Sequence, residues 1–103
     1  MLAKGPRLEA RTVRGDTALL LAVNAGAVEV AEKLLAQHVD KDTQNEFGDT
    51  ALIIASRNGN TALVQRLLKA GASTRLRNKD RASAADVARA RAFPAIAELL
   101  KNA

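Results

Sequence analysis

A period of 33 residues constrains the fold of this chain more than any other feature of its sequence. The pentapeptide Gly-Asp-Thr-Ala-Leu fills residues 15–19 and returns at residues 48–52. Over residues 15–35 and 48–68 this offset gives nine identities in 21 positions, where average residue usage gives about one or two. A third, weaker copy follows at the same offset. Such self-similarity predicts a repeat protein, whose units bury apolar surface against their neighbours.

Each copy predicts two short helices. In the second copy, Thr50 is placed as the N-cap of a first helix, and Asn58-Gly59 interrupts that helix. A second helix is expected over about Thr61–Lys69, where leucine and valine recur on one face. Gly71 follows, and we expect it to end this helix in the left-handed conformation.

The other two copies give the same pattern. In the first, helices are expected near Thr17–Ala25 and Ala27–Gln37. In the third, Ser83 and Asp86 have the spacing of a capping box. Pro94 occupies the place of a first helical residue, where its missing N–H costs nothing.

A short helix, a turn, a second helix and a polar link, repeated every 33 residues, closely resemble the ankyrin repeat. That family's G-x-T-P-L-H-x-A-A-x-x-G pattern is similar to GDTALLLAVNAG at residues 15–26 and to GDTALIIASRNG at residues 48–59. Gly71-Ala72-Ser73 matches the family's closing triplet. The resemblance covers essentially the whole chain. It implies an all-α ankyrin-repeat solenoid, in which stacked helix-turn-helix pairs are joined by hairpin loops.

The resemblance also predicts one domain divided into four parts. Residues 1–14 correspond to the tail of an upstream repeat, residues 15–47 and 48–80 to two full repeats, and residues 81–103 to a C-terminal capping repeat. In this register Arg81 stands where the family has glycine. His38 likewise replaces the glycine that closes the first repeat. Lys101 stands where the family has a core leucine, as suits the polar outer face of a cap.

The N-terminal end of the predicted stack has little to cover it. The two helices that should precede residues 1–14 are missing, so we expect Leu20, Leu21 and Val28 to face outward with little cover. Two hypotheses follow. The chain is the C-terminal part of a longer array, or it covers this uncapped N-terminal end by self-association.

Catalytic, metal and membrane functions find no support in the sequence. There is no cysteine, His38 is the single histidine, and the glycines are scattered singly rather than gathered in a phosphate-binding loop. We therefore predict no catalytic, cofactor or metal site. No apolar run approaches the roughly 20 residues of a membrane helix, and the N-terminus lacks a signal-peptide core. If Met1 is the native start, the simplest localisation is cytoplasmic.

The family resemblance implies a non-catalytic protein–protein interaction module that binds through a concave surface of hairpin tips and first helices. Phe47 is the prominent candidate: either it anchors a partner, or it packs against the neighbouring hairpin. By register, the predicted partner-binding residues are Val13, Arg14, Asp16, Asn24, Glu46, Phe47, Asp49, Arg57, Asn58, Lys79, Asp80 and Arg91.

The C-terminal third of the chain is basic. Residues 67–103 hold eight Lys or Arg against three Asp or Glu. Arg75, Arg77, Lys79 and Arg81 alternate, and an extended strand would place them on one face. This row is either a solvated, solubilising surface or a contact for an acidic segment of a protein partner. Two alternatives remain: electrostatic nucleic-acid association through this basic C-terminal hairpin, although no aromatic platform for bases is present, or a purely structural role at the end of a longer array.

Overall fold

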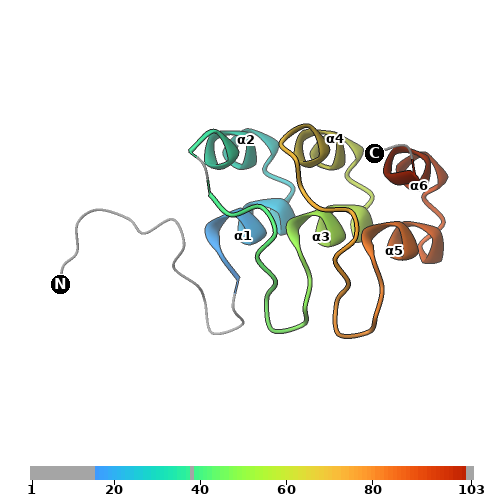
Figure 1. The fold of residues 1–103 in the computed structure, drawn as a ribbon. Coiled ribbons are helices and arrows are strands. Elements are labelled where there is room, and N and C mark those ends of the chain that lie inside the picture. The colour runs from blue at the N-terminus through green and yellow to red at the C-terminus, as the bar shows by residue number, and fades with distance from the viewer. Residues whose placement is uncertain (1–15, 38, 102–103) are drawn as a thin grey trace.

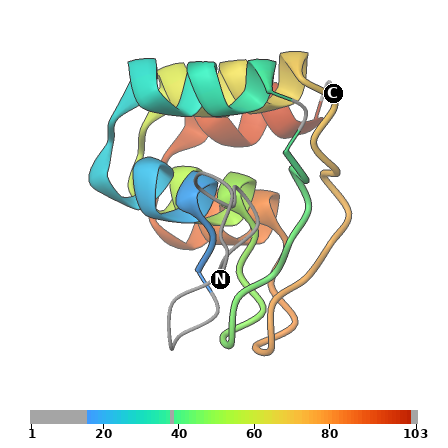
Figure 2. The same ribbon diagram turned by 90° about the vertical axis from the view of Figure 1, so that its left-hand side faces the viewer.

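The chain folds into stacked helix-turn-helix pairs. The computed structural model describes residues 16–37 and 39–101, so His38 and the segment before Asp16 lie outside the described residues. Within that part, the pairs are α1 (Ala18–Ala25) with α2 (Val28–Ala36), α3 (Ala51–Arg57) with α4 (Thr61–Lys69), and α5 (Ala84–Ala90) with α6 (Pro94–Lys101). The first helices of the pairs form one layer and the second helices another, while the connecting hairpins project to one side (Figures 1 and 2). The predicted all-α solenoid is confirmed.

The same hydroxyl cap starts the first helix of each pair. Thr17, Thr50 and Ser83 have extended backbones, and each side-chain oxygen accepts a hydrogen bond from the N–H three residues later. In α5 the predicted capping box is confirmed, because the Asp86 carboxylate also accepts the Ser83 N–H at 3.0 Å. That hydrogen bond lowers the pKa of Asp86 against the opposing effect of burial. The cap therefore stabilises the fold above the ordinary Asp pKa and weakens as acid protonates the folded carboxyl.

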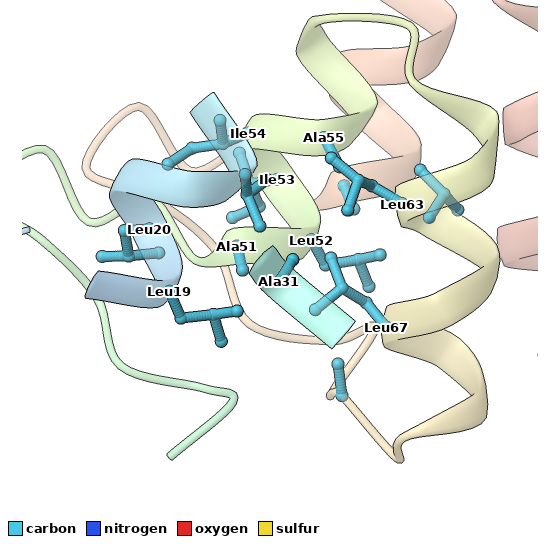
Figure 3. Close-up of a cluster of buried hydrophobic side chains, with 14 of the residues drawn as sticks. Leu19, Leu20, Ala31, Ala51, Leu52, Ile53, Ile54, Ala55, Leu63 and Leu67 are labelled. Carbon is cyan, nitrogen blue, oxygen red and sulfur yellow. The ribbon is translucent and has the colours of Figure 1, made fainter. Parts of the chain in front are cut away.

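Alanines and branched aliphatic side chains fill the core between the layers (Figure 3). Ala31, Ala51 and Ala55 are fully buried between larger side chains such as Leu52 and Leu67. Because these small residues face the neighbouring helices, successive pairs approach closely and their cores merge into one continuous cluster. The first helices and the hairpins are thereby fixed relative to one another.

Glycine is needed at the hairpin tip of the second repeat for two separate reasons. Gly48 has a φ of 77°, in the left-handed region, and a Cβ there would lie 2.7 Å from the backbone nitrogen of Lys79 in the next hairpin. Gly71, the predicted helix terminator, also has a positive φ of 92°, but a Cβ there would meet no heavy atom closer than 3.9 Å. Arg81, one period after Gly48, keeps the positive φ at 65°. Within residues 16–37 and 39–101 no further hairpin packs beyond it, so a side chain fits.

The N-terminal face of the stack exposes apolar side chains that the other repeats bury. Val30 is 50% exposed, whereas Leu63 and Ile96, at the same place in the next two repeats, are 0% and 1% exposed. Leu21 is likewise 46% exposed, against 5% for its equivalent Ile54. These positions are the ones that a preceding helix pair covers elsewhere in the stack.

The expectation that Leu20 would be poorly covered is wrong. Leu20 is only 2% exposed and belongs to the core cluster, whereas its neighbour Leu21 is exposed. Successive helical residues are rotated by about 100°, so these two leucines cannot share one face. Val28 is partly buried and packs against the same cluster.

Alanine substitutions at Gly48 and Gly71 separate the effect of the left-handed backbone from that of the close approach between hairpins. Gly71→Ala is expected to cost about 1 kcal/mol, because only the left-handed backbone disfavours a side chain. Gly48→Ala is expected to cost about 2–4 kcal/mol, since overpacking against the backbone of the next hairpin is added. Urea unfolding of both variants measures the difference. Equal losses would contradict the close approach of the hairpins at Gly48.

Candidate functional site

Two asparagines, 33 residues apart, shape the hairpin tips. The side-chain oxygen of Asn45 accepts the backbone N–H groups of Phe47 at 2.9 Å and Asp49 at 3.1 Å. Asn78 does the same in the next hairpin, with the N–H groups of Asp80 at 2.9 Å and Ala82 at 3.0 Å. One amide thus satisfies two donors of a tight turn, which gives each tip a defined conformation.

The same asparagines also tie each tip to an aspartate 29 residues earlier, which precedes the first helix of the same repeat. The amide of Asn45 donates to the Asp16 carboxylate at 2.8 Å, and that of Asn78 donates to the Asp49 carboxylate at 3.0 Å. The tips are also joined directly, because the Lys79 N–H donates to the Phe47 carbonyl at 3.0 Å. Successive tips therefore form a row held by repeated hydrogen bonds rather than a set of independent loops.

Asp49 anchors Arg57, which lies in the last turn of α3. Its carboxylate is buried at 4% exposure and receives both terminal nitrogens of Arg57 at 3.0 Å. These hydrogen bonds raise the pKa of Arg57, outweighing the desolvation that lowers it. The guanidinium, with its side chain one-third exposed, is consequently charged and held in place.

A small pocket of about 120 Å³ lies where these elements meet. Phe47 forms one side and is 51% exposed, so the aromatic ring remains available at the surface. The lining residues are Asp16, Asn24, Asn45, Phe47, Asp49, Ile54 and Arg57. Together they offer an aromatic ring, an apolar floor and a fixed set of hydrogen-bonding groups, which suit recognition of a side chain or an extended backbone. Within the described ranges no three His, Asp or Glu residues gather as metal ligands.

A family model described as "Ankyrin repeats (3 copies)" matches residues 1–78 and residues 19–103. The chain belongs to the ankyrin-repeat family. Ankyrin repeats are generally protein–protein interaction modules and are typically non-catalytic. Comparison with curated proteins gave no match. Of the helices described, none is both long enough and apolar enough to cross a membrane.

The ankyrin stack brings together about half of the predicted binding residues. Asp16, Asn24, Phe47, Asp49 and Arg57 line the pocket. Asp49, however, is buried. Its carboxylate accepts hydrogen bonds from Arg57 and from Asn78 of the next tip, so it positions these two residues. Val13 and Arg14 lie outside the described residues. The predicted residues that are exposed but do not line the pocket are Glu46, Asn58, Lys79, Asp80 and Arg91.

The predicted basic strand is wrong in its geometry. Arg75, Arg77, Lys79 and Arg81 are all exposed, but they do not follow one extended strand. The chain turns at Lys79–Asp80, where the Arg81 N–H donates to the Asn78 carbonyl at 2.9 Å. Arg81 then adopts a positive φ beyond the turn. Because the turn separates these cations, the regular alternation that suggested one charged face does not hold.

Sequence reasoning missed the residues that fix the tips. Asn45, Asn78 and Gln44 were not among the predicted site residues, although the two asparagines are separated by the repeat period. Gln44 donates to the carbonyls of Gly48 and Arg77, each at 2.8 Å, and so also links neighbouring hairpins. Extending the 33-residue alignment through the hairpin would have identified the asparagine pair.

Removing the Asp49 carboxylate should loosen the tips and destabilise the fold. Asp49→Ala is expected to cost about 2–3 kcal/mol, since a buried ion pair and the bond from Asn78 are lost while Arg57 stays partly hydrated. Asp80→Ala, which removes an exposed carboxylate from the same region, should cost less than about 0.5 kcal/mol. Urea unfolding compares the two variants. A loss for Asp49→Ala no larger than for Asp80→Ala would rule out the anchoring role.

Proposed function

We propose that this ankyrin-repeat chain is a non-catalytic binding module that recognises another protein through the concave surface formed by its hairpin tips and first helices. The observation that carries the proposal is the half-exposed Phe47 ring beside a fixed Arg57 in one pocket. Aromatic and arginine side chains dominate the energetics of protein interfaces. Their joint placement supports a contact site at this position.

Preorganisation supports the same proposal. The tips are held by their own asparagines and by bonds to neighbouring hairpins, and Arg57 is held by Asp49. A partner that binds here need not order these loops, so less of its binding free energy is lost to conformational entropy. The exposure of Phe47 favours its interpretation as a partner contact over packing against the next hairpin.

The contribution of Phe47 can be tested with peptides selected on the full chain from a random display library. Phe47→Ala should weaken such peptides about tenfold or more and leave the circular dichroism spectrum unchanged. Arg57 is kept intact in this test, because its loss would leave the Asp49 carboxylate buried without its ion pair.

Val30→Ala is the matched control for Phe47→Ala. It trims an apolar side chain of equal exposure on the second-helix layer, away from the tips, and should leave peptide affinity within about twofold. If both variants bind alike, or if Phe47→Ala unfolds the chain, the contact role proposed for Phe47 is wrong.

We further propose that the exposed N-terminal face pairs with a second copy of this chain. Leu21 and Val30 stand at positions that the other repeats bury, so their burial between two copies would stabilise the dimer through the hydrophobic effect.

Sedimentation equilibrium should show a concentration-dependent dimer. Leu21→Gln with Val30→Gln should shift this association toward monomer, whereas Phe47→Gln, equally exposed on another surface, should not. A strictly monomeric chain would instead favour a preceding repeat of a longer array as the cover of this face.

A further inference from the structure

A groove lies on the layer of second helices, away from the pocket beside Phe47. It has a volume of about 730 Å³, and its lining residues come from α4, α6 and the chain segment that leaves α4. Its floor is apolar, formed by Leu68, Ala72, Ala95 and Leu99. Polar and charged groups stand on its rim: Lys69, Ser73, Thr74, Arg75 and Glu98.

The preceding interface between repeats shows why this groove is open and apolar. There, Glu32 of α2 and Arg66 of α4 form an ion pair at the corresponding cleft, which has a smaller volume of about 400 Å³. One period later the same two positions are Gln65 and Leu99. Gln65 and Leu99 cannot form such an ion pair. The apolar Leu99 side chain therefore lines this groove at the position where Arg66 lines the preceding cleft.

The charged residues on the rim indicate which kind of ligand fits the groove. Lys69 and Arg75 take no part in the ion pairs that join the described residues. Glu98 is the one carboxylate in the lining, so the lining carries a net positive charge. The last third of the chain adds to it, with eight basic residues against three acidic ones over residues 67–103. An apolar ligand segment with carboxylates on its flanks matches both the floor and the rim.

We propose that this groove binds an acidic amphipathic helix of a protein partner. Leucine-type side chains of that helix enter between Leu68 and Leu99, and its carboxylates meet Lys69 and Arg75. A helix suits the site because anchors at positions i, i+3, i+4 and i+7 form one apolar stripe with polar residues beside it. The site is separate from the pocket beside Phe47, so the two surfaces can be tested independently.

The test uses a synthetic helical peptide with leucine at those anchor positions and glutamate elsewhere, titrated against the full chain. Binding should shift the backbone amide resonances of residues 68–75 and 95–99 in a ¹⁵N correlation spectrum. Gln65→Glu with Leu99→Arg rebuilds the ion-pair chemistry of the preceding interface without changing the net charge. This double variant should weaken binding about tenfold or more.

A second pair of variants separates the rim charges from general electrostatics. Lys69→Gln with Arg75→Gln should weaken the peptide about tenfold, whereas Arg77→Gln with Arg81→Gln removes equal charge outside the groove and should change affinity by less than about twofold. A matched leucine–lysine peptide should bind at least about tenfold more weakly. The proposal is overturned if the leucine–glutamate peptide fails to bind, if its resonance shifts lie elsewhere, or if the Gln65/Leu99 variant binds normally. Preferential binding of a single-stranded oligonucleotide, equally reduced by both charge-removing pairs, would likewise overturn it and favour nucleic acid.

Discussion

The close approach of one helix pair to the next is the constraint on which this structure depends. Alanines at the facing positions, such as Ala51 and Ala55, let helices pack without intervening bulk. The same spacing brings the backbone of one hairpin tip against that of the next, and it sets the asparagine amides opposite the aspartates that precede α1 and α3. The core and the row of hairpin tips therefore share one geometric origin, so a change in helix spacing would also misplace the tips.

Much of this architecture could be predicted from the amino-acid sequence, because periodicity and local capping are properties of single residues at fixed spacings. The α4 helix, the Ser83–Asp86 capping box and the left-handed Gly71 all follow from such patterns. The predictions that failed concern the direction in which side chains point and the chain runs. The sequence could not show which of Leu20 and Leu21 points inward, nor that the turn at Lys79–Asp80 breaks the alternation of the basic residues.

The pocket beside Phe47 was only partly predictable for a related reason. The repeat register placed Phe47 and Arg57 on one surface, but it could not show that the Arg57 guanidinium is gripped by a buried Asp49. That pairing joins side chains eight positions apart, one before α3 and one in its last turn, and it depends on the long Arg57 side chain reaching back along the helix. Nor could the register show the groove beside Leu99, because its opening depends on which pairs of side chains meet across successive helices.

The left-handed arginine at position 81 has a consequence for how such a protein can grow by gene duplication. At Gly48, a following hairpin brings backbone atoms to within 2.7–3.0 Å of the place where a Cβ would stand. A duplicated unit inserted after the third repeat would bring the same backbone against the side chain of Arg81. Packing a further hairpin there in the same geometry would therefore need either a shift of its backbone or glycine at position 81.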